Sequence, residues 1–219
     1  MEEVAVNYVN AAFDLDYSDM NARMAMPYDK MMEDFVRINE AKVKKYREMD
    51  MDDELIEQQE EMLEVLSGNP LEAFFDQCAG LLKESRSYEF GKDYKRSVEM
   101  VYERELPESE QKEFLETLKS NFDQYNTYID DAESKLRISN YFAINKVDAI
   151  YEITCEVTEE GAEDFRTTEV EFMILEINGK FKAFDGMFGG GDSVLNYVDM
   201  SGIDTSKLDE NLKSIFGMY

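Results

Sequence analysis

Apolar and polar residues alternate with a period of two in the second half of the chain. Between residues 147 and 157 the odd positions are apolar and, with one exception, the even positions are polar, which places one set on a buried face and the other in water. Runs at 171–177 and 180–184 are separated by Asn178-Gly179, a strong hairpin signal because both turn residues adopt positive φ. Residues 138–184 are therefore predicted to form three consecutive antiparallel strands.

The first half of the chain shows the helical period instead. Apolar residues recur every three or four positions over residues 3–85, which predicts a series of amphipathic helices. A strand is predicted at 94–105, and a helix is expected to start close to Pro107. The fold class that follows is α+β, with helices, mostly N-terminal, packed on a curved antiparallel sheet of about four strands.

The pattern also predicts how the chain is divided. Residues 1–188 are expected to form a single α+β domain, with helices at 3–85 and a strand-helix-three-strand unit at 94–186. Residues 189–219 would be a C-terminal linker and short helix, because three consecutive glycines at 189–191 favour a flexible joint. Asp204 is placed to cap that short helix.

Composition narrows the class of partner. The 219 residues are 43% hydrophobic, enough to form a core without disulfides or a structural metal. Fifty acids against 23 bases give a net charge of −27, which disfavours nucleic acid and anionic membrane surfaces. No apolar run approaches the roughly 18 residues of a membrane helix, so no transmembrane segment is predicted.

The chain has no histidine, which removes Ser-His-Asp and Cys-His nucleophiles, imidazole-bound metals and the commonest general base. The acidic run that starts at Asp14 begins like a calcium loop, but it has Asp19 where glycine is needed and Ala25 where glutamate is needed. The glycine-rich segment 186–192 lacks the Lys-Ser/Thr of a P-loop. We therefore predict no catalytic residue, no metal site and no cofactor, and an enzyme is the less favoured interpretation.

For four side chains the sequence allows two alternative roles each. Cys78 and Cys155 each lie on an apolar stripe, so they are either two buried thiols or one disulfide. Tyr102 and Tyr151 each lie on the predicted apolar face of a strand. These two tyrosines either line a ligand pocket with their hydroxyl groups or belong to the core with their hydroxyls satisfied. They are the candidate ligand-binding residues of the sequence.

The strand pattern resembles a known group of domains. The alternating strand 147–157, the run 169–177 and the hairpin 178–186 together resemble the cone-shaped α+β domains of the nuclear transport factor-like and cystatin-like groups. More closely, they resemble the uncharacterised bacterial lipoproteins built on these domains. The opening helix, which carries Tyr8, also fits the group, whereas the long helical stretch 27–85 departs from a minimal cone with three short helices.

The resemblance implies a pocket between a curved sheet and the helices. Some members of these groups are ketosteroid isomerase-like enzymes with an aspartate base and tyrosine donors, and others only bind ligands or proteins. We expect an extracytoplasmic, lipoprotein-type domain that binds an unknown small ligand or a protein without catalysis. The alternatives are a pocket enzyme that uses a carboxylate and tyrosine, and a cytoplasmic interaction or scaffold protein.

The start of the chain leaves the location open. Met1 leads directly into an amphipathic helix with no basic start or apolar signal core before it. Either the protein is cytoplasmic, or a signal segment was removed and the native N-terminus carries a lipid anchor. The resemblance favours the second alternative, a cell-surface lipoprotein.

Overall fold

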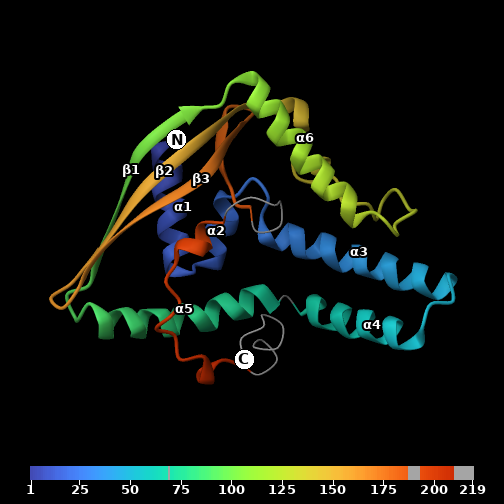
Figure 1. Ribbon diagram of the computed structural model, residues 1–219, viewed down its shortest axis with the longest axis horizontal. Coiled ribbons are helices and arrows are strands. Elements are labelled where there is room, and N and C mark those ends of the chain that lie inside the picture. Colours follow the sequence, from blue (N-terminus) through green and yellow to red (C-terminus); the bar gives the residue numbers. More distant parts are fainter. Residues whose placement is uncertain (69, 187–192, 210–219) are drawn as a thin grey trace.

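The computed structural model describes residues 1–68, 70–186 and 193–209, and it confirms an α+β fold whose helices are mostly N-terminal. In the described ranges, four strands form one antiparallel sheet in the order β1-β2-β3-β4 (Figure 1). Asn178 and Gly179 have φ angles of 52° and 70°, so the predicted hairpin between the last two strands is confirmed. The strands are β1 (Lys95–Glu105), β2 (Val147–Glu160), β3 (Phe165–Ile177) and β4 (Lys180–Phe184).

Six α-helices lie within the described ranges. One of them, α2, occupies the acidic segment that begins like a calcium loop. The Asp16 carboxylate accepts a hydrogen bond from the Asp19 backbone N–H at 2.9 Å and so caps the N-terminus of this helix. The helices are α1 (Glu2–Asp14), α2 (Tyr17–Arg23), α3 (Tyr28–Glu48), α4 (Asp53–Ser67), α5 (Pro70–Glu89) and α6 (Glu108–Tyr125).

The prediction that strands begin at residue 138 is wrong for the first nine residues. Short 3₁₀ turns occupy Ile138–Asn140 and Ile144–Lys146, and β2 begins only at Val147. Ile138 and Phe142 are buried in this segment. Their apolar character therefore reflects packing of an irregular connection and not a strand period.

Helix α1 covers one face of the sheet, and α6 touches the other face at one end. The Tyr8 ring of α1 packs against Phe172 with ring centroids 5.6 Å apart. The Phe114 ring of α6 packs edge-on against Phe184, which lies opposite Met173 in the sheet. Phe172 and Met173 are neighbours on β3, so their side chains point to opposite faces. Helix α1 therefore packs on one face of the sheet, and α6 meets the opposite face only near the end of β4, where Phe184 lies.

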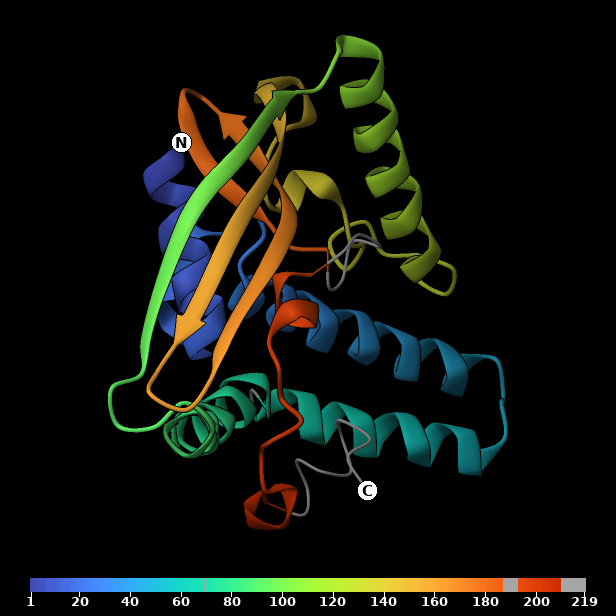
Figure 2. The same cartoon turned by 60° about the vertical axis from the view of Figure 1, so that its left-hand side comes forward.

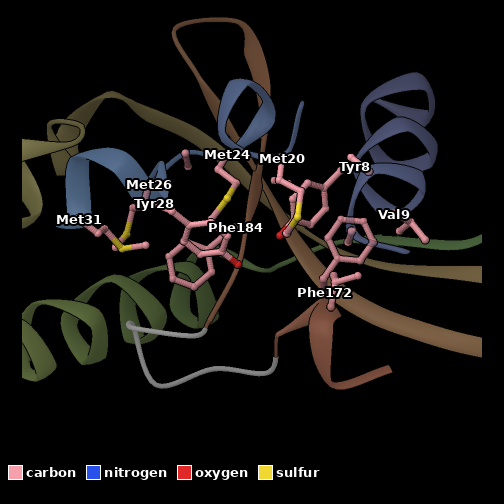
Figure 3. Close-up of a cluster of buried hydrophobic side chains, with 14 of the residues drawn as sticks. Tyr8, Val9, Met20, Met24, Met26, Tyr28, Met31, Phe172 and Phe184 are labelled. Carbon is pink, nitrogen blue, oxygen red and sulfur yellow. The ribbon is translucent and has the colours of Figure 1, made fainter. Parts of the chain in front are cut away.

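The core behind the sheet is rich in methionine. Met20, Met24, Met26 and Met31 are at most 2% exposed, and they pack with the aromatic rings of the core (Figure 3). Methionine is flexible and polarisable, and sulfur-aromatic contacts are favourable. These flexible side chains fill an irregular space beside the sheet. Rigid branched residues would fit that space less easily.

The segment 193–209 packs on the rest of the molecule. Val194, Val198, Ile203 and Leu208 are buried in the same core as the sheet. The Asp204 carboxylate accepts from the Ser206 backbone N–H at 3.1 Å and caps a 3₁₀ turn. The predicted glycine joint at 189–191 and the remainder of the predicted terminal helix lie outside the described residues.

The helices α3 and α4 form a hairpin that projects away from the sheet (Figures 1 and 2). All 15 residues of α4 are described, and none of them is buried. The part of the chain that the structure describes contains no helix apolar and long enough to span a bilayer.

Candidate functional site

The structure places Tyr102 and Tyr151 on opposite faces of the sheet. The register between β1 and β2 shifts after Met100, so that Met100 pairs with Cys155 but Tyr102 pairs with Thr154. The extra residue of this β-bulge turns the rest of β1 over. Tyr102 is 48% exposed, so the prediction that it lies on the apolar face is wrong, and the two tyrosines do not meet in one pocket.

Tyr151 is half-buried and surrounded by acids. Its ring packs edge-on against Phe181, and its hydroxyl donates to the Glu176 carboxylate at 3.3 Å. Partial burial, with the negative charges of Glu105 and Glu176, raises the pKa of the Tyr151 hydroxyl above its ordinary value. This hydroxyl is therefore protonated at neutral pH and engaged with a side chain of its own sheet.

A buried carboxylate that the sequence analysis did not single out lies at the end of β4. Asp185 is 1% exposed and accepts three hydrogen bonds, from the Tyr8 hydroxyl at 2.7 Å, the Ser193 hydroxyl at 2.9 Å and the Val194 backbone N–H at 3.3 Å. Burial, and then the charge of Asp185, holds the pKa of Tyr8 and of Tyr28 well above the ordinary range. The cluster joins α1, the end of β4 and the segment that follows it.

This cluster has the groups that a ketosteroid isomerase-like enzyme would need, but it is closed. Its carboxylate faces Tyr8 and Tyr28, which are both 0% exposed, and not the predicted Tyr102 or Tyr151. In this conformation Asp185 is 1% exposed, and three protein donors already occupy its Oδ2 atom. The arrangement satisfies a buried charge and fixes the fold.

A second buried polar cluster holds the opposite end of the sheet. The Arg86 guanidinium lies 3.0 Å from the Glu159 carboxylate, and both side chains are less than 10% exposed. The Tyr94 hydroxyl donates to the same carboxylate at 2.6 Å, and Arg86 donates to the Phe13 carbonyl oxygen at 2.5 Å. These bonds tie α5 to β2 and to the C-terminal end of α1, which makes the cluster a structural cross-link.

Both cysteines are free and buried, so the alternative of two thiols is confirmed. Burial raises the pKa of Cys78 to about 11 and that of Cys155 to about 12. The reactive thiolate form is therefore negligible at neutral pH, and neither residue is activated as a nucleophile.

An open apolar groove lies between α3, α4 and the end of α6. We call it the hairpin groove, and its volume is about 410 Å³. Its floor includes Ile38, which is 3% exposed, and Lys42 is the one cation among its lining residues. The apolar and aromatic side chains of its walls are Met32 and Phe35 of α3, Met62 and Leu66 of α4, Tyr125 at the end of α6, and Tyr128 in the turn that follows.

The walls of the hairpin groove expose large apolar side chains to solvent. Met62 is 50% exposed, Tyr125 is 41% exposed and Tyr128 is 40% exposed. The Phe35 and Tyr125 rings meet edge-on with centroids 5.4 Å apart, so part of the wall is fixed in place. Clustered apolar surface of this kind marks binding sites more often than isolated exposed residues do.

The outer surface of α4 is acidic. This helix carries six acidic residues and neither lysine nor arginine. An ion pair between Arg47 of α3 and Glu60 holds it against the neighbouring helix. The hairpin groove therefore has an apolar lining beside a strongly negative helix. The sequence signal for this site was the amphipathic pattern of residues 53–67, which predicts a helix but not which face stays uncovered.

Comparison with protein-family models, with curated proteins and with solved structures found no match to this chain. Among the described residues, no three carboxylate or thiol side chains converge into a set of metal ligands. The resemblance to nuclear transport factor-like and cystatin-like domains stays a prediction from the strand pattern. The assignment of function therefore depends on the geometry of the groove and of the buried clusters.

Proposed function

We propose that this chain is a non-catalytic binding domain that takes part of another protein into the hairpin groove. The observation that supports this proposal most is the exposure of Met62 on α4, a helix that buries none of its residues although it carries an apolar stripe. Leaving the exposed part of that stripe in water is unfavourable by about 25 cal/mol for each Å² of apolar surface. A partner that covers the groove would recover that free energy.

The chemistry of the described residues supports binding over catalysis. The chain lacks histidine, the buried Asp185 carboxylate is enclosed by its own donors, and burial raises the pKa of both thiols. The commonest general base is thus absent from the sequence, and both thiols and the Asp185 carboxylate are buried. The hairpin groove, by contrast, is open to solvent.

We place the native protein outside the cytoplasm as a lipid-anchored, lipoprotein-type domain. The support for this location is the resemblance of strands 147–157 and 169–177 and of the hairpin 178–186 to bacterial lipoproteins. The competing proposal is a cytoplasmic interaction or scaffold protein. Labelling of the full native gene product with radioactive palmitate, together with protease digestion of intact cells, separates the two. Label and surface cleavage support the anchor, and an unlabelled, protected protein contradicts it.

Site-specific photo-crosslinking tests the groove. Benzoylphenylalanine replaces Tyr125, a wall residue, or Tyr102, which lies on the sheet and has similar exposure, 48% against 41%. We expect light to form one discrete protein adduct at position 125 in the native cellular location and none at position 102. Equal labelling at both positions, or no adduct at position 125, would contradict the proposed function.

A further inference from the structure

We propose that the occupant of the hairpin groove is an amphipathic helix with a basic flank, contributed by another protein. This inference rests on the proposed function and names the class of partner. Three properties of the groove support it: its length along α3, the chemistry of its lining and the charge of the helix beside it.

The length of the groove matches a short helix. Its lining residues on α3 run from Met32 to Lys42 and share one face of the helix. At 1.5 Å per residue, this stretch of α3 is about 15 Å long. On α4, Met62 and Leu66 are one turn apart and face the same trough. A helix laid along it would present apolar residues at i, i+4 and i+7, the pattern of helix-in-groove recognition.

The lining suits an apolar helix face of variable shape. Met32 and Met62 contribute flexible side chains that adjust to different anchors. Tyr125 and Tyr128 contribute rings with an apolar body and a polar tip. Aromatic and methionine side chains are enriched where proteins bind one another.

Charge selects among the apolar partners. The six acids of α4 lie along a helix of 15 residues, which is about 22 Å long. Neighbouring acids are therefore well within one Debye length of about 8 Å at physiological salt. A second copy of this chain, with its net charge of −27, would bring like charges together, and an anionic lipid surface would do the same. A basic flank that lies along α4, away from Lys42 of α3, would instead be attracted and steered into place.

Three labelled peptides of equal length test the inference with the full chain. The first is an 18-residue helix of leucine and lysine with one apolar stripe. The second has the same composition in a scrambled order without the stripe, and the third keeps the stripe but has glutamate for lysine. Fluorescence anisotropy at 150 mM salt is expected to show saturable one-to-one binding of the first peptide. The second should bind at least ten-fold more weakly, and the third should not bind.

Two glutamate variants separate the effect of apolar contact on peptide binding from the effect of negative charge. Met62→Glu adds a negative charge inside the groove, and Met49→Glu adds the same charge outside it, at a residue with the same 50% exposure. If the apolar wall binds the peptide, Met62→Glu weakens binding at least ten-fold and Met49→Glu does not. If attraction to the acidic surface alone drives binding, Met62→Glu leaves binding unchanged or tightens it, which overturns the inference.

The matched tyrosine pair provides a readout without a change in charge. Tyr125→Ala should weaken binding of the leucine-lysine peptide about ten-fold, whereas Tyr102→Ala should leave it unchanged, with far-ultraviolet circular dichroism confirming that both variants fold. Equal affinity for the striped and scrambled peptides contradicts the inference. So does tight binding of the glutamate peptide.

Failure of the partner class can be told apart from failure of the proposed function. If no peptide binds but benzoylphenylalanine at position 125 still forms its protein adduct, the groove binds a partner of another class and only this inference is wrong. If no peptide binds and no protein adduct forms at position 125, both this inference and the proposed function are wrong. Sedimentation of the unliganded chain as a dimer that Tyr125→Ala dissociates would assign the groove to a second copy and would also overturn the inference.

Discussion

The helices α1 and α4 have similar amphipathic sequences but differ in how far they are buried. Six of the 13 residues of α1 are buried, whereas α4 buries none of its 15. The apolar stripe of α1 is covered by the sheet, where Tyr8 meets Phe172. The stripe of α4 packs on one neighbouring helix and leaves Met62 half exposed. An amphipathic stripe therefore predicts a surface that needs covering, but it does not show whether the same chain supplies the cover.

The difference extends to polar groups. Near α1, Asp185 and Glu159 are buried and bonded to donors from distant parts of the chain. Along α4, the acids lie at the surface, and the ion pair of Glu60 with Arg47 is solvent-exposed. Buried charges must be satisfied because an unpaired one is costly, whereas exposed charges are screened and free to meet a partner. The first region specifies the fold and the second is available for recognition.

The largest expected effect comes from truncating the two kinds of apolar side chain. Phe172→Ala, under α1, should lower the free energy of unfolding by about 3–5 kcal/mol because it leaves a cavity. Met62→Ala, on α4, should lower it by less than about 1 kcal/mol because half of the side chain is already in water. Urea denaturation followed by circular dichroism measures both values. Similar losses for the two variants would mean that α4 is part of the core.

The next effect concerns the buried carboxylate. Asp185→Asn keeps the shape of the side chain but removes the charge that accepts from Tyr8, Ser193 and Val194. We expect a loss of about 2 kcal/mol, in the range of a hydrogen bond to a charged group. Asp76→Asn on the exposed face of α5 is the control and should change little. If the two variants unfold at the same urea concentration, Asp185 does not stabilise the fold through its charge.

A smaller effect, graded with pH, is expected from the buried tyrosines. Burial and Asp185 raise the pKa of Tyr8 and Tyr28 in the folded chain, while in the unfolded chain tyrosine titrates near pH 10. Above pH 10 the unfolded state therefore loses protons first, and each such tyrosine lowers the free energy of unfolding by about 1.4 kcal/mol per pH unit. Below pH 10 this contribution does not change with pH.

The variant Tyr8→Phe should reduce the fall in the free energy of unfolding between pH 10 and 11, because one of the two buried tyrosines no longer contributes to it. Urea unfolding at pH 9, 10 and 11 measures the slope, and Tyr102→Phe on the exposed sheet face is the matched control. Identical slopes for wild type and Tyr8→Phe would show that Tyr8 is not shielded from water in solution.

The sequence predicted the strands better than it predicted their faces. The hairpin at Asn178 was recognisable because its turn geometry depends on two adjacent residues. The face of Tyr102 was not, because the bulge after Met100 is a property of the pairing between β1 and β2. The apolar residues near Ile138 were misread as a strand for a related reason. A short apolar run has the same composition in a strand and in a buried turn.

The two buried clusters were also beyond local sequence reasoning. Asp185 and Tyr8 are 177 positions apart, and Arg86 and Glu159 meet across two elements. Each residue alone resembles an ordinary acid, tyrosine or arginine of a soluble protein. Among 50 acids, no pattern marks the three that are buried in the described part of the chain, Asp34, Glu159 and Asp185.

The amino-acid sequence by itself determined the order of helices and strands, the antiparallel hairpin, the negative charge and the chemistries that a chain without histidine cannot use, because these follow from near neighbours and from composition. Tertiary structure alone decided that Asp185 is enclosed, that Tyr102 faces water and that the stripe of α4 stays partly exposed beside a groove. Burial and exposure are properties of surfaces brought together from distant parts of the chain, and packing, not periodicity, determines which surfaces meet.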